Sequence, residues 1–219
     1  MVVVRWHGHA CFEIVTSKGT VIVLDPHDGY SIGLKPPRVQ ADIVLITHEH
    51  FDHNAYAVVA KPSATVLSMF VGEKAVNDVM IKGFEAYHDR EKGKRRGRVS
   101  IYKVYADNIS FVHLGDLGHE LDNTYKNVLG DIDVLMIPVG GTYTIDPKSA
   151  WNVIELLTPK VVIPMHYWVK GLNLPLKAVD EFLSLKPDDW SVNMIESNQI
   201  VIERSSIPNK VIYVMSPPT

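Results

Sequence analysis

Residues 43–53 read Ile-Val-Leu-Ile-Thr-His-Glu-His-Phe-Asp-His, and they change from apolar to polar at the midpoint. The first half is an apolar, β-branched run that predicts a strand buried on both faces. The second half places three histidines and two acids within six residues. A buried strand that ends in His48, His50, Asp52 and His53 offers four ligands from one rigid support, which is typical of a catalytic metal site.

The residue types in this cluster indicate the cation that it suits. Neutral imidazoles and a carboxylate bind zinc, manganese or iron, and a motif without thiolates argues against a closed structural zinc site. A purely structural role is the alternative. In that case each buried histidine would need a hydrogen-bond partner, and protonated neighbours would repel one another. The cluster therefore favours bound metal over a packing role.

The ordered pattern His48-x-His50-x-Asp52-His53 resembles the signature of the metallo-β-lactamase superfamily, whose members are mostly hydrolases with one or two metal ions. The resemblance implies an α/β (α+β) fold, a four-layer αβ/βα sandwich with the site at one edge, between the sheets. Within the superfamily, the chain looks most like the branch of ascorbate-phosphate lactonases and of a phospholipase D that acts on N-acyl-phosphatidylethanolamine.

The composition is ordinary for a globular protein. With 219 residues, of which 46% are hydrophobic and 21% charged, we expect one domain over residues 1–219. The net charge of −3 does not indicate nucleic acid or an acidic membrane as a partner. Cys11 is the only cysteine, and the sequence has neither a basic leader nor an apolar run of membrane-spanning length. We therefore expect a cytoplasmic protein, and the sequence leaves its oligomeric state open.

Short elements surround the motif. Ala75, Val76 and Val79 fall on one helical face and predict a helix over 73–80. The pair Asp107-Asn108 predicts the turn of a hairpin between 99–105 and 109–114. We also expect strands at 2–6, 11–16, 20–24, 65–70, 132–139, 161–163, 199–203 and 210–215, and helices at 55–60, from Asp146-Pro147 to Thr158, and after Pro175.

Candidate ligands repeatedly follow predicted strands. Asp25 follows the strand at 20–24, Asp116 the strand at 109–114, and His166 the strand at 161–163. If these strands are parallel, their carboxyl ends meet at one edge of a sheet, where α/β folds bind ligands. The sequence therefore predicts that these residues converge on the histidine cluster.

The resemblance assigns roles to these residues. Asp25 corresponds to an acid that hydrogen-bonds the ligands from outside, a role that Thr47 could share. His88 is the best match for a third histidine of the first metal, although His113 and His119 compete with it. The implied ligands are His48, His50 and His88 for one ion, Asp52, His53 and His166 for a second ion, and Asp116 as the bridge between them.

Two divalent ions would give such a site its chemistry, with zinc expected and manganese or iron as alternatives. Cations roughly 3.5–4 Å apart share a water molecule and lower its pKa to about 7, so that a metal-bound hydroxide attacks the substrate at neutral pH. Asp52 would orient that nucleophile and take its proton, which makes it the catalytic candidate. The expected substrate is a small ester, lactone or phosphodiester, possibly an anion.

Three further features have both a structural and a functional interpretation. His9 and His119 are ordinary structural histidines by default, but they are also candidates for contacts to the substrate or to the ligands. The basic run from Lys92 to Arg98 is a solvated loop by default, or it binds a phosphate or carboxylate. Because no aromatic residues interrupt that run, it argues against a nucleic-acid groove.

Two alternatives to a small-molecule hydrolase remain open. A phosphodiesterase or nuclease would use the basic loop to hold phosphates. A metal-binding protein without turnover would keep the ligands and lack hydrolysis. A di-iron redox enzyme is more remote, because the redox relatives carry glutamate at the position of His50 and have a separate flavin domain.

Overall fold

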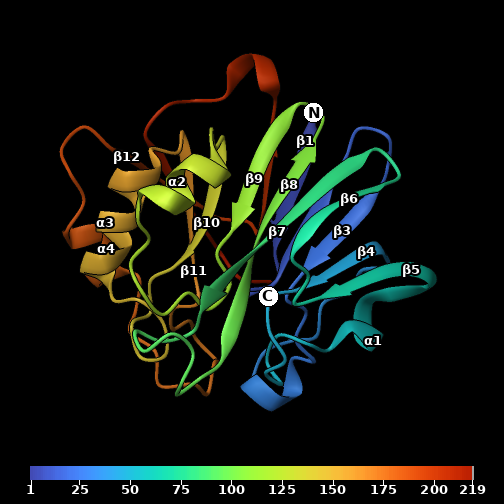
Figure 1. Cartoon of the computed structure of the whole chain (residues 1–219), viewed down its shortest axis with the longest axis horizontal. Coiled ribbons are helices and arrows are strands. Elements are labelled where there is room, and N and C mark those ends of the chain that lie inside the picture. Colours follow the sequence, from blue (N-terminus) through green and yellow to red (C-terminus); the bar gives the residue numbers. More distant parts are fainter. Residues whose placement is uncertain (219) are drawn as a thin grey trace.

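The computed structural model describes residues 1–218, which form two facing β-sheets with helices on the outside (Figure 1). The first sheet has six strands in the order β13-β1-β2-β3-β4-β5. Segments far apart in the chain meet in this sheet, since β13 pairs with β1. Its strands are β1 (Val2–Trp6), β2 (Phe12–Val15), β3 (Val21–Leu24), β4 (Ala41–Ile46), β5 (Ala60–Ser68) and β13 (Gln199–Ile202).

The second sheet has eight strands in the order β12-β14-β11-β10-β9-β8-β7-β6. Its members are β6 (Gly72–Val76), β7 (Val79–Tyr87), β8 (Arg98–Ala106), β9 (Ile109–His113), β10 (Val134–Pro138), β11 (Val161–Met165), β12 (Ser191–Ile195) and β14 (Val211–Met215).

Strand direction brings the candidate ligands together. In the first sheet β4 runs parallel to both neighbours, β3 and β5. In the second sheet β9, β10, β11, β14 and β12 form a parallel series. Because parallel strands end at the same edge, the residues after β3 and β4 lie together, and so do those after β9 and β11.

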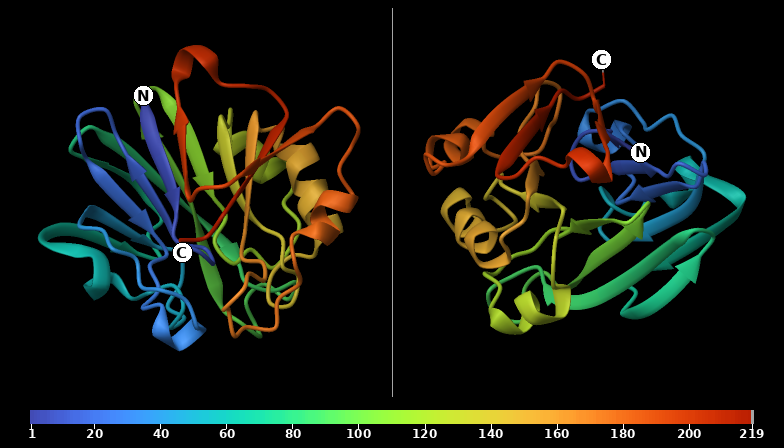
Figure 2. Two further views of the ribbon diagram at one scale, coloured as in Figure 1. Left: turned by 180° about the vertical axis from the view of Figure 1, so that it is seen from behind. Right: turned by 90° about the horizontal axis from the view of Figure 1, so that it is seen from above.

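Most helices lie outside the second sheet. In Figure 1, α2 (Asn123–Leu129), α3 (Pro147–Leu157) and α4 (Asp180–Ser184) lie together beside β10 and β12. Seen from above, α3 and α4 lie on the side opposite the first sheet (Figure 2). As predicted, α3 has Pro147 in its first turn, and the carboxylate of Asp146 accepts the N–H of Ser149 at 2.8 Å.

The outer layer of the first sheet is thin. It contains α1 (Tyr56–Val59), a helix of four residues. Within residues 1–218, 3-10 turns are found at Tyr30–Ile32 and Arg204–Ser206. Under α1, Val59 packs in a small buried cluster with Cys11, Val23 and Val44. The predicted α/β sandwich is thus confirmed, with most of its helical cover on one side.

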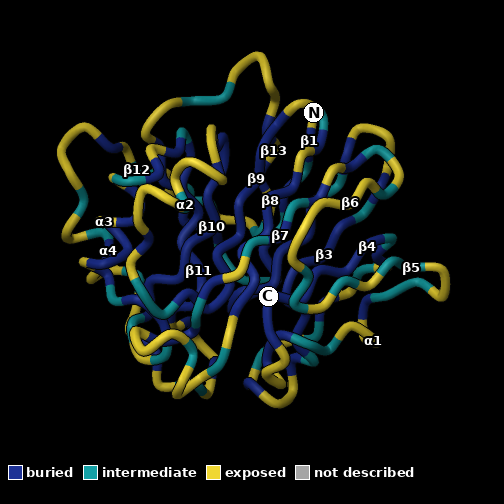
Figure 3. Tube along the Cα trace, viewed as in Figure 1, coloured by how far each residue is buried: buried dark blue, intermediate teal, exposed yellow. Residues whose placement is uncertain are grey.

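The main core lies between the two sheets. Figure 3 shows the central strands buried and the connecting loops exposed. β1 alternates buried and partly buried residues, so Val2, Val4 and Trp6 face the core. Phe12 from β2 and Phe111 from β9 join the same cluster, which therefore draws on both sheets. This packing fixes the strand ends that carry the candidate ligands.

The predicted helix over 73–80 is wrong, because this segment is a β-hairpin. β6 and β7 are antiparallel, and Val76 pairs with Val79 across the turn. Asn77 has a φ of 53°, and Asn tolerates this left-handed conformation better than most residues. The apolar residues that fit a helical stripe instead flank a two-residue Asn-Asp turn.

Two elements escaped the sequence-based assignment, and one is shorter than expected. α2 lies between β9 and β10, and its start is capped by Asp122, whose carboxylate accepts the N–H of Thr124 at 2.8 Å. β12 is a short strand at the edge of the second sheet, and the helix predicted after Pro175 is limited to Asp180–Ser184. Across residues 1–218, no helix is long and apolar enough to span a bilayer.

Candidate metal centre

Asp25 and Thr47 form the base of the site, where β3 and β4 end side by side. The N–H and the hydroxyl of Thr47 donate to the two carboxylate oxygens of Asp25, each at 2.7 Å. Nδ1 of His53 donates to the same carboxylate at 3.0 Å. Asp25 is completely buried. It therefore ties the end of β4 to the last histidine of the motif, as its predicted outer role requires.

These hydrogen bonds set the orientation of two imidazoles. Because the hydroxyl hydrogen of Thr47 is donated to Asp25, its oxygen accepts from Nδ1 of His48, which lies 3.0 Å away. Nε2 of His48 then carries the lone pair. In the same way, donation from Nδ1 of His53 to Asp25 turns Nε2 of His53 toward the cluster, where it would bind a metal after losing its proton. Both rings therefore offer Nε2 as a ligand atom.

Asp116 lies at the centre of the cluster. Its Oδ2 is 3.0 Å from Nε2 of His166, 3.3 Å from Nε2 of His88 and 3.8 Å from Nε2 of His48. Its Oδ1 is 3.3 Å from Nε2 of His53. The structure thus brings together histidines that follow β4, β7 and β11 around one buried carboxylate.

Two glycines allow the loops that carry these ligands to approach closely. At Gly118, an added Cβ would lie 2.2 Å from the main-chain carbon of His88. At Gly140, it would lie 2.1 Å from the carbonyl oxygen of His166. No side chain fits at either position without moving a ligand.

The candidate ligand atoms form two groups that surround Asp116, besides a third set at the base of the site, Asp25, His48 and His53. Within each group the atoms lie within 4.8 Å of one another. The first group consists of the ligands predicted for the first ion. The second group consists of the ligands predicted for the second ion, together with His9. The groups are His48, His50 and His88, and His9, Asp52, His53 and His166.

Unpaired buried atoms support a cation in these groups. Among the described residues, Nε2 of His48, Nε2 of His166 and Oδ1 of Asp116 are buried and form no hydrogen bond of proper geometry, in spite of the short distances to their neighbours. Leaving such groups unpaired costs about 1–3 kcal/mol each. All three atoms face the centre of the cluster, and imidazole nitrogens with carboxylate oxygens are a donor set that zinc accepts. The residues present therefore fit a metal.

Backbone strain is concentrated at the same place. His9, Asp25 and His166 have φ values of 54°, 45° and 53°, in the left-handed region that residues other than glycine rarely adopt. The main chain also links the two sheets here, since the N–H of His166 donates to the carbonyl of His9 at 3.0 Å. Strain of this kind, about 1–3 kcal/mol per residue, gathers at functional sites.

The protonation states suit metal binding. Burial, assisted by the charge of His53, lowers the pKa of His48 to about 3. Burial also lowers the pKa of His88 to about 4. Both rings are therefore neutral at pH 7, the form in which imidazole binds a metal.

Asp116 and His53 are shifted as an ion pair. Burial alone would raise the pKa of Asp116, but His166 and His53 hold it well below its ordinary value. Burial alone would lower the pKa of His53, but Asp116 and Asp25 raise it well above its ordinary value. The metal-free protein thus keeps a proton on His53, and a cation bound there would displace that proton.

Four of the five histidines outside the predicted ligand set have different surroundings. Nε2 of His9 lies 3.1 Å from Oδ2 of Asp52, inside the cluster. Nε2 of His113 bonds the carbonyl of Ala10, and Nε2 of His27 bonds the carbonyl of His7. His119 has both ring nitrogens bonded to the main chain, through the N–H of Tyr87 and the carbonyl of Glu120. The structure therefore brings His9 to the site, and does not bring His113, His27 or His119.

A pocket of about 370 Å³ opens above the cluster. Besides predicted ligands, it is lined by Glu49, Phe51, Arg96, Tyr143 and Leu174. Sequence reasoning missed Tyr143 and Leu174, which come from the loops after β10 and β11. The glycine pair Gly140-Gly141 was the only local signal near Tyr143. The volume is at the small end of the range for small-molecule sites.

Comparisons with known proteins agree with this geometry. The model of the family described as "Beta-lactamase superfamily domain" matches residues 3–166. A UPF0173 metal-dependent hydrolase of Thermococcus onnurineus is 34% identical over 228 residues, covering 92% of this chain and 99% of the relative. A Thermotoga maritima structure assigned to the metallo-beta-lactamase superfamily has a TM-score of 0.79 and 36% identity, with coverage of 98% and 99%. A metallo hydrolase of Ignicoccus hospitalis shares the fold, with a TM-score of 0.61, 22% identity and coverage of 83% and 88%.

Proposed function

This chain belongs to the beta-lactamase superfamily of metal-dependent hydrolases, and we propose that it hydrolyses a small molecule at a centre of two divalent cations. The single observation that carries the proposal is that members of both ligand groups lie within 4 Å of the buried carboxylate of Asp116. One group alone would suffice for one ion. Two groups that share a central carboxylate favour two ions.

Each cation would have its own ligands. His48, His50 and His88 would hold the first. Asp52, His53 and His166 would hold the second, with Asp116 between the two. Nitrogen and carboxylate ligands favour zinc, and manganese or iron would fit the same donors. When bound, such ions act as Lewis acids and lower the pKa of water to about 7.

Asp52 is the residue that we propose for handling the proton. Its carboxylate faces the pocket and is bonded by His9 at 3.1 Å. Burial would raise its pKa, but the hydrogen bond from His9 and the charge of His53 lower the pKa below its ordinary value. Asp52 is therefore ionised at pH 7, so it can accept a hydrogen bond from the attacking water and fix its direction.

Asp52→Asn tests this role. The amide keeps the shape of the side chain and removes the acceptor charge. With the metal content retained, we expect hydrolysis to fall by about 10²–10⁴-fold, the usual contribution of a positioned acid or base. Asp28→Asn is the matched control, because Asp28 bonds only Ser31 in an exposed loop. Turnover unchanged in Asp52→Asn would refute the role of Asp52.

Substrate class needs a separate measurement. The pocket volume of about 370 Å³ supports a small ester, lactone or phosphodiester. The zinc-loaded protein should be assayed against a panel of these three classes, with elemental analysis of the same sample. Protein that holds two ions per chain and hydrolyses none of them would favour a metal-binding role without turnover.

A further inference from the structure

The segment after His88 is a rigid loop at the mouth of the pocket. Asp89 is buried, and its carboxylate accepts four main-chain N–H groups. They belong to Glu91 at 2.7 Å, Gly93 at 3.0 Å, Arg95 at 2.9 Å and Arg96 at 2.8 Å. Hydrogen bonds to a charged acceptor are among the strong ones. The backbone of this basic loop is therefore fixed to the residue next to a proposed ligand.

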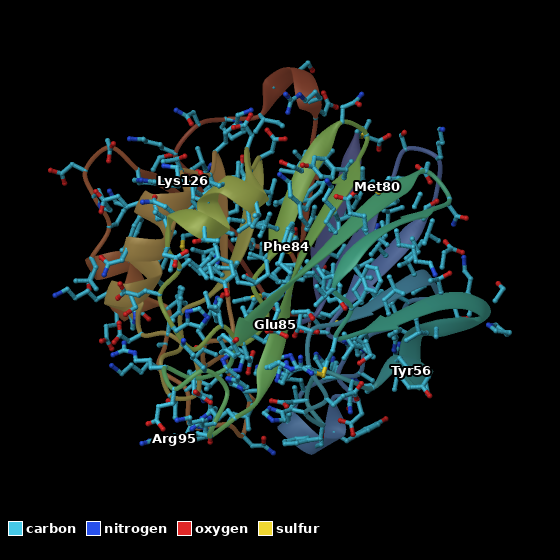
Figure 4. All side chains as sticks on the ribbon, in the orientation of Figure 1. Tyr56, Met80, Phe84, Glu85, Arg95 and Lys126 are labelled. Atoms are coloured by element: carbon cyan, nitrogen blue, oxygen red, sulfur yellow. The ribbon has the colours of Figure 1, made fainter. Side chains whose placement is uncertain are left out.

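Most arginines near this loop are already paired with acids. Arg95 pairs with Glu91 at 2.6 Å, and Arg98 pairs with Glu85 at 2.7 Å. Arg95 lies at the periphery of the molecule in Figure 4. Such side chains behave as an ordinary solvated surface.

Arg96 differs from these arginines. Among residues 1–218, no carboxylate lies within 4.0 Å of its guanidinium group. Instead, its Cζ lies 4.8 Å from the ring centroid of Tyr143. An aromatic ring at this distance attracts the cation and limits its movement without neutralising its charge. Arg96 is thus an oriented arginine whose charge has no partner.

The position of Arg96 indicates what its charge faces. Arg96 lines the pocket together with His50, Asp52 and His88. Glu49 lines the same pocket, but its carboxylate accepts hydrogen bonds from Asn54, at 2.9 Å, and from Ser68. The acid that lines the pocket outside the metal cluster is therefore bonded to other groups.

The remaining wall of the pocket is apolar. Phe51 is 58% exposed although it is a large aromatic residue, and it lines the pocket. Leu174, partly buried, lines it as well. An exposed aromatic side chain beside a polar cluster is a common feature of a ligand-binding wall.

We propose that Arg96, oriented by Tyr143, binds an anionic group of the substrate, a carboxylate or a phosphate, while an apolar part of the same molecule lies against Phe51 and Leu174. The proposal rests on the proposed hydrolysis in this pocket and specifies its substrate class. Planar guanidinium groups bind carboxylate and phosphate oxygens through two parallel N–H donors. Arg96 is a substrate-binding residue here, so its loss should act on KM rather than on kcat.

The test uses the zinc-loaded protein with two esters of similar size. p-Nitrophenyl butyrate is neutral, and mono-p-nitrophenyl glutarate carries a carboxylate. For Arg96→Gln we expect KM for the charged ester to rise about tenfold or more, with kcat and the neutral ester within about twofold of the wild type. Arg95→Gln is the matched control, since its exposed side chain pairs with Glu91 outside the pocket wall. Equal effects of the two variants, or equal effects on the two esters, would overturn the proposal.

Calorimetric binding separates this proposal from the question of turnover. Phenylphosphonate and phenylacetate serve as phosphate-like and carboxylate-like probes, and phenylacetamide serves as the neutral control. We expect Arg96→Gln to weaken one or both anions about tenfold and the amide by less than twofold, and the more affected anion identifies the group. If the wild type hydrolyses neither ester, this measurement still decides the role of Arg96. Unchanged affinity for both anions would refute it.

Discussion

Oδ2 of Asp116 lies 3.0 Å from Nε2 of His166, although the two residues follow different strands of the second sheet. Asp116 follows β9 and His166 follows β11, and both strands are parallel to the β10 strand between them. The contact therefore results from the topology, which brings the two loops to the same edge. It also makes Asp116 the residue whose removal should affect both proposed ions.

Asp116→Asn should lose both metal and turnover. The amide cannot supply the negative charge that both ligand groups face, so we expect the bound zinc to fall by one to two ions per chain. Metal ions contribute several kcal/mol of transition-state stabilisation, and each 1.36 kcal/mol corresponds to about a tenfold change in rate. Hydrolysis should therefore fall by about a thousandfold. Elemental analysis and initial rates measure the two effects. Asp107→Asn, at the turn between β8 and β9, is the control, and an Asp116 variant with a full metal content would contradict the central role.

Much of the site could be predicted from the sequence because it depends on local pattern. The change from apolar to polar at Thr47 locates the end of β4 and four ligand candidates. Asp25 and His166 were identified by the same rule, as polar residues that directly follow apolar strands. His88 was harder, because His113 and His119 also lie near strand ends. Only the tertiary structure distinguishes among these three histidines, because it shows which of them lies in the cluster.

The remaining differences have physical causes. The spacing of Ala75, Val76 and Val79 fits both a helix and a hairpin, and the pairing of β6 with β7 shows that the chain forms the hairpin. Tyr143 and Leu174 reach the pocket through loops whose path no periodicity determines. His9 lies inside the cluster, where its backbone adopts a left-handed conformation between β1 and β2, which a His-Gly-His triplet does not reveal.

Thr47→Val should weaken metal binding, and it also removes the hydroxyl that donates to the buried carboxylate of Asp25. Valine has the same shape and cannot accept the hydrogen from Nδ1 of His48, so the imidazole loses its fixed tautomer. Groups that orient a ligand in this way typically contribute 10–100-fold to affinity or activity. Zinc titration against a competing chelator measures the change. Thr65→Val makes the same exchange on the neighbouring β5 and should leave the affinity unchanged; equal affinities in all three proteins would argue against the orienting role.

Gly140→Ala should displace His166. The new Cβ would meet the carbonyl oxygen of His166 at 2.1 Å, so the loop after β11 must move. We expect a loss of about 1–3 kcal/mol in the free energy of unfolding, the usual cost of overpacking, together with lower zinc affinity. Gly19→Ala is the control for zinc affinity, because a Cβ there meets no atom within 4 Å, although its φ of 86° strains an alanine and lowers stability by itself. Urea denaturation and zinc titration of both variants test this, and an unchanged zinc affinity in Gly140→Ala would show that His166 is not held by this contact.

Zinc should stabilise the fold. A ligand that binds only the native state at a hundred times its Kd adds about 2.7 kcal/mol. For a chain of this length, that corresponds to a rise of roughly 5–11 °C in Tm. Calorimetry with zinc and with EDTA measures the shift. His48→Ala combined with His53→Ala should abolish it while the protein still unfolds cooperatively, and an equal shift in that double variant would place the bound zinc elsewhere.

The metal-free protein should become less stable as the pH falls below about 6.5, and His27 provides a clean test of one contribution. His27 is fully buried, its Nε2 donates to the carbonyl of His7 at 3.1 Å, and burial lowers its pKa to about 4. Between pH 6.5 and 4 the unfolded chain therefore binds a proton that the folded chain does not. Stability due to this group is complete above pH 6.5 and is lost as the pH falls toward 4.

His27→Gln keeps an N–H donor and removes the titration. With EDTA present, its free energy of unfolding should depend less steeply on pH, by up to about 1.4 kcal/mol per pH unit. Denaturation curves from pH 8 to 4.5 measure both slopes, and parallel curves would show that His27 does not resist protonation in the folded state.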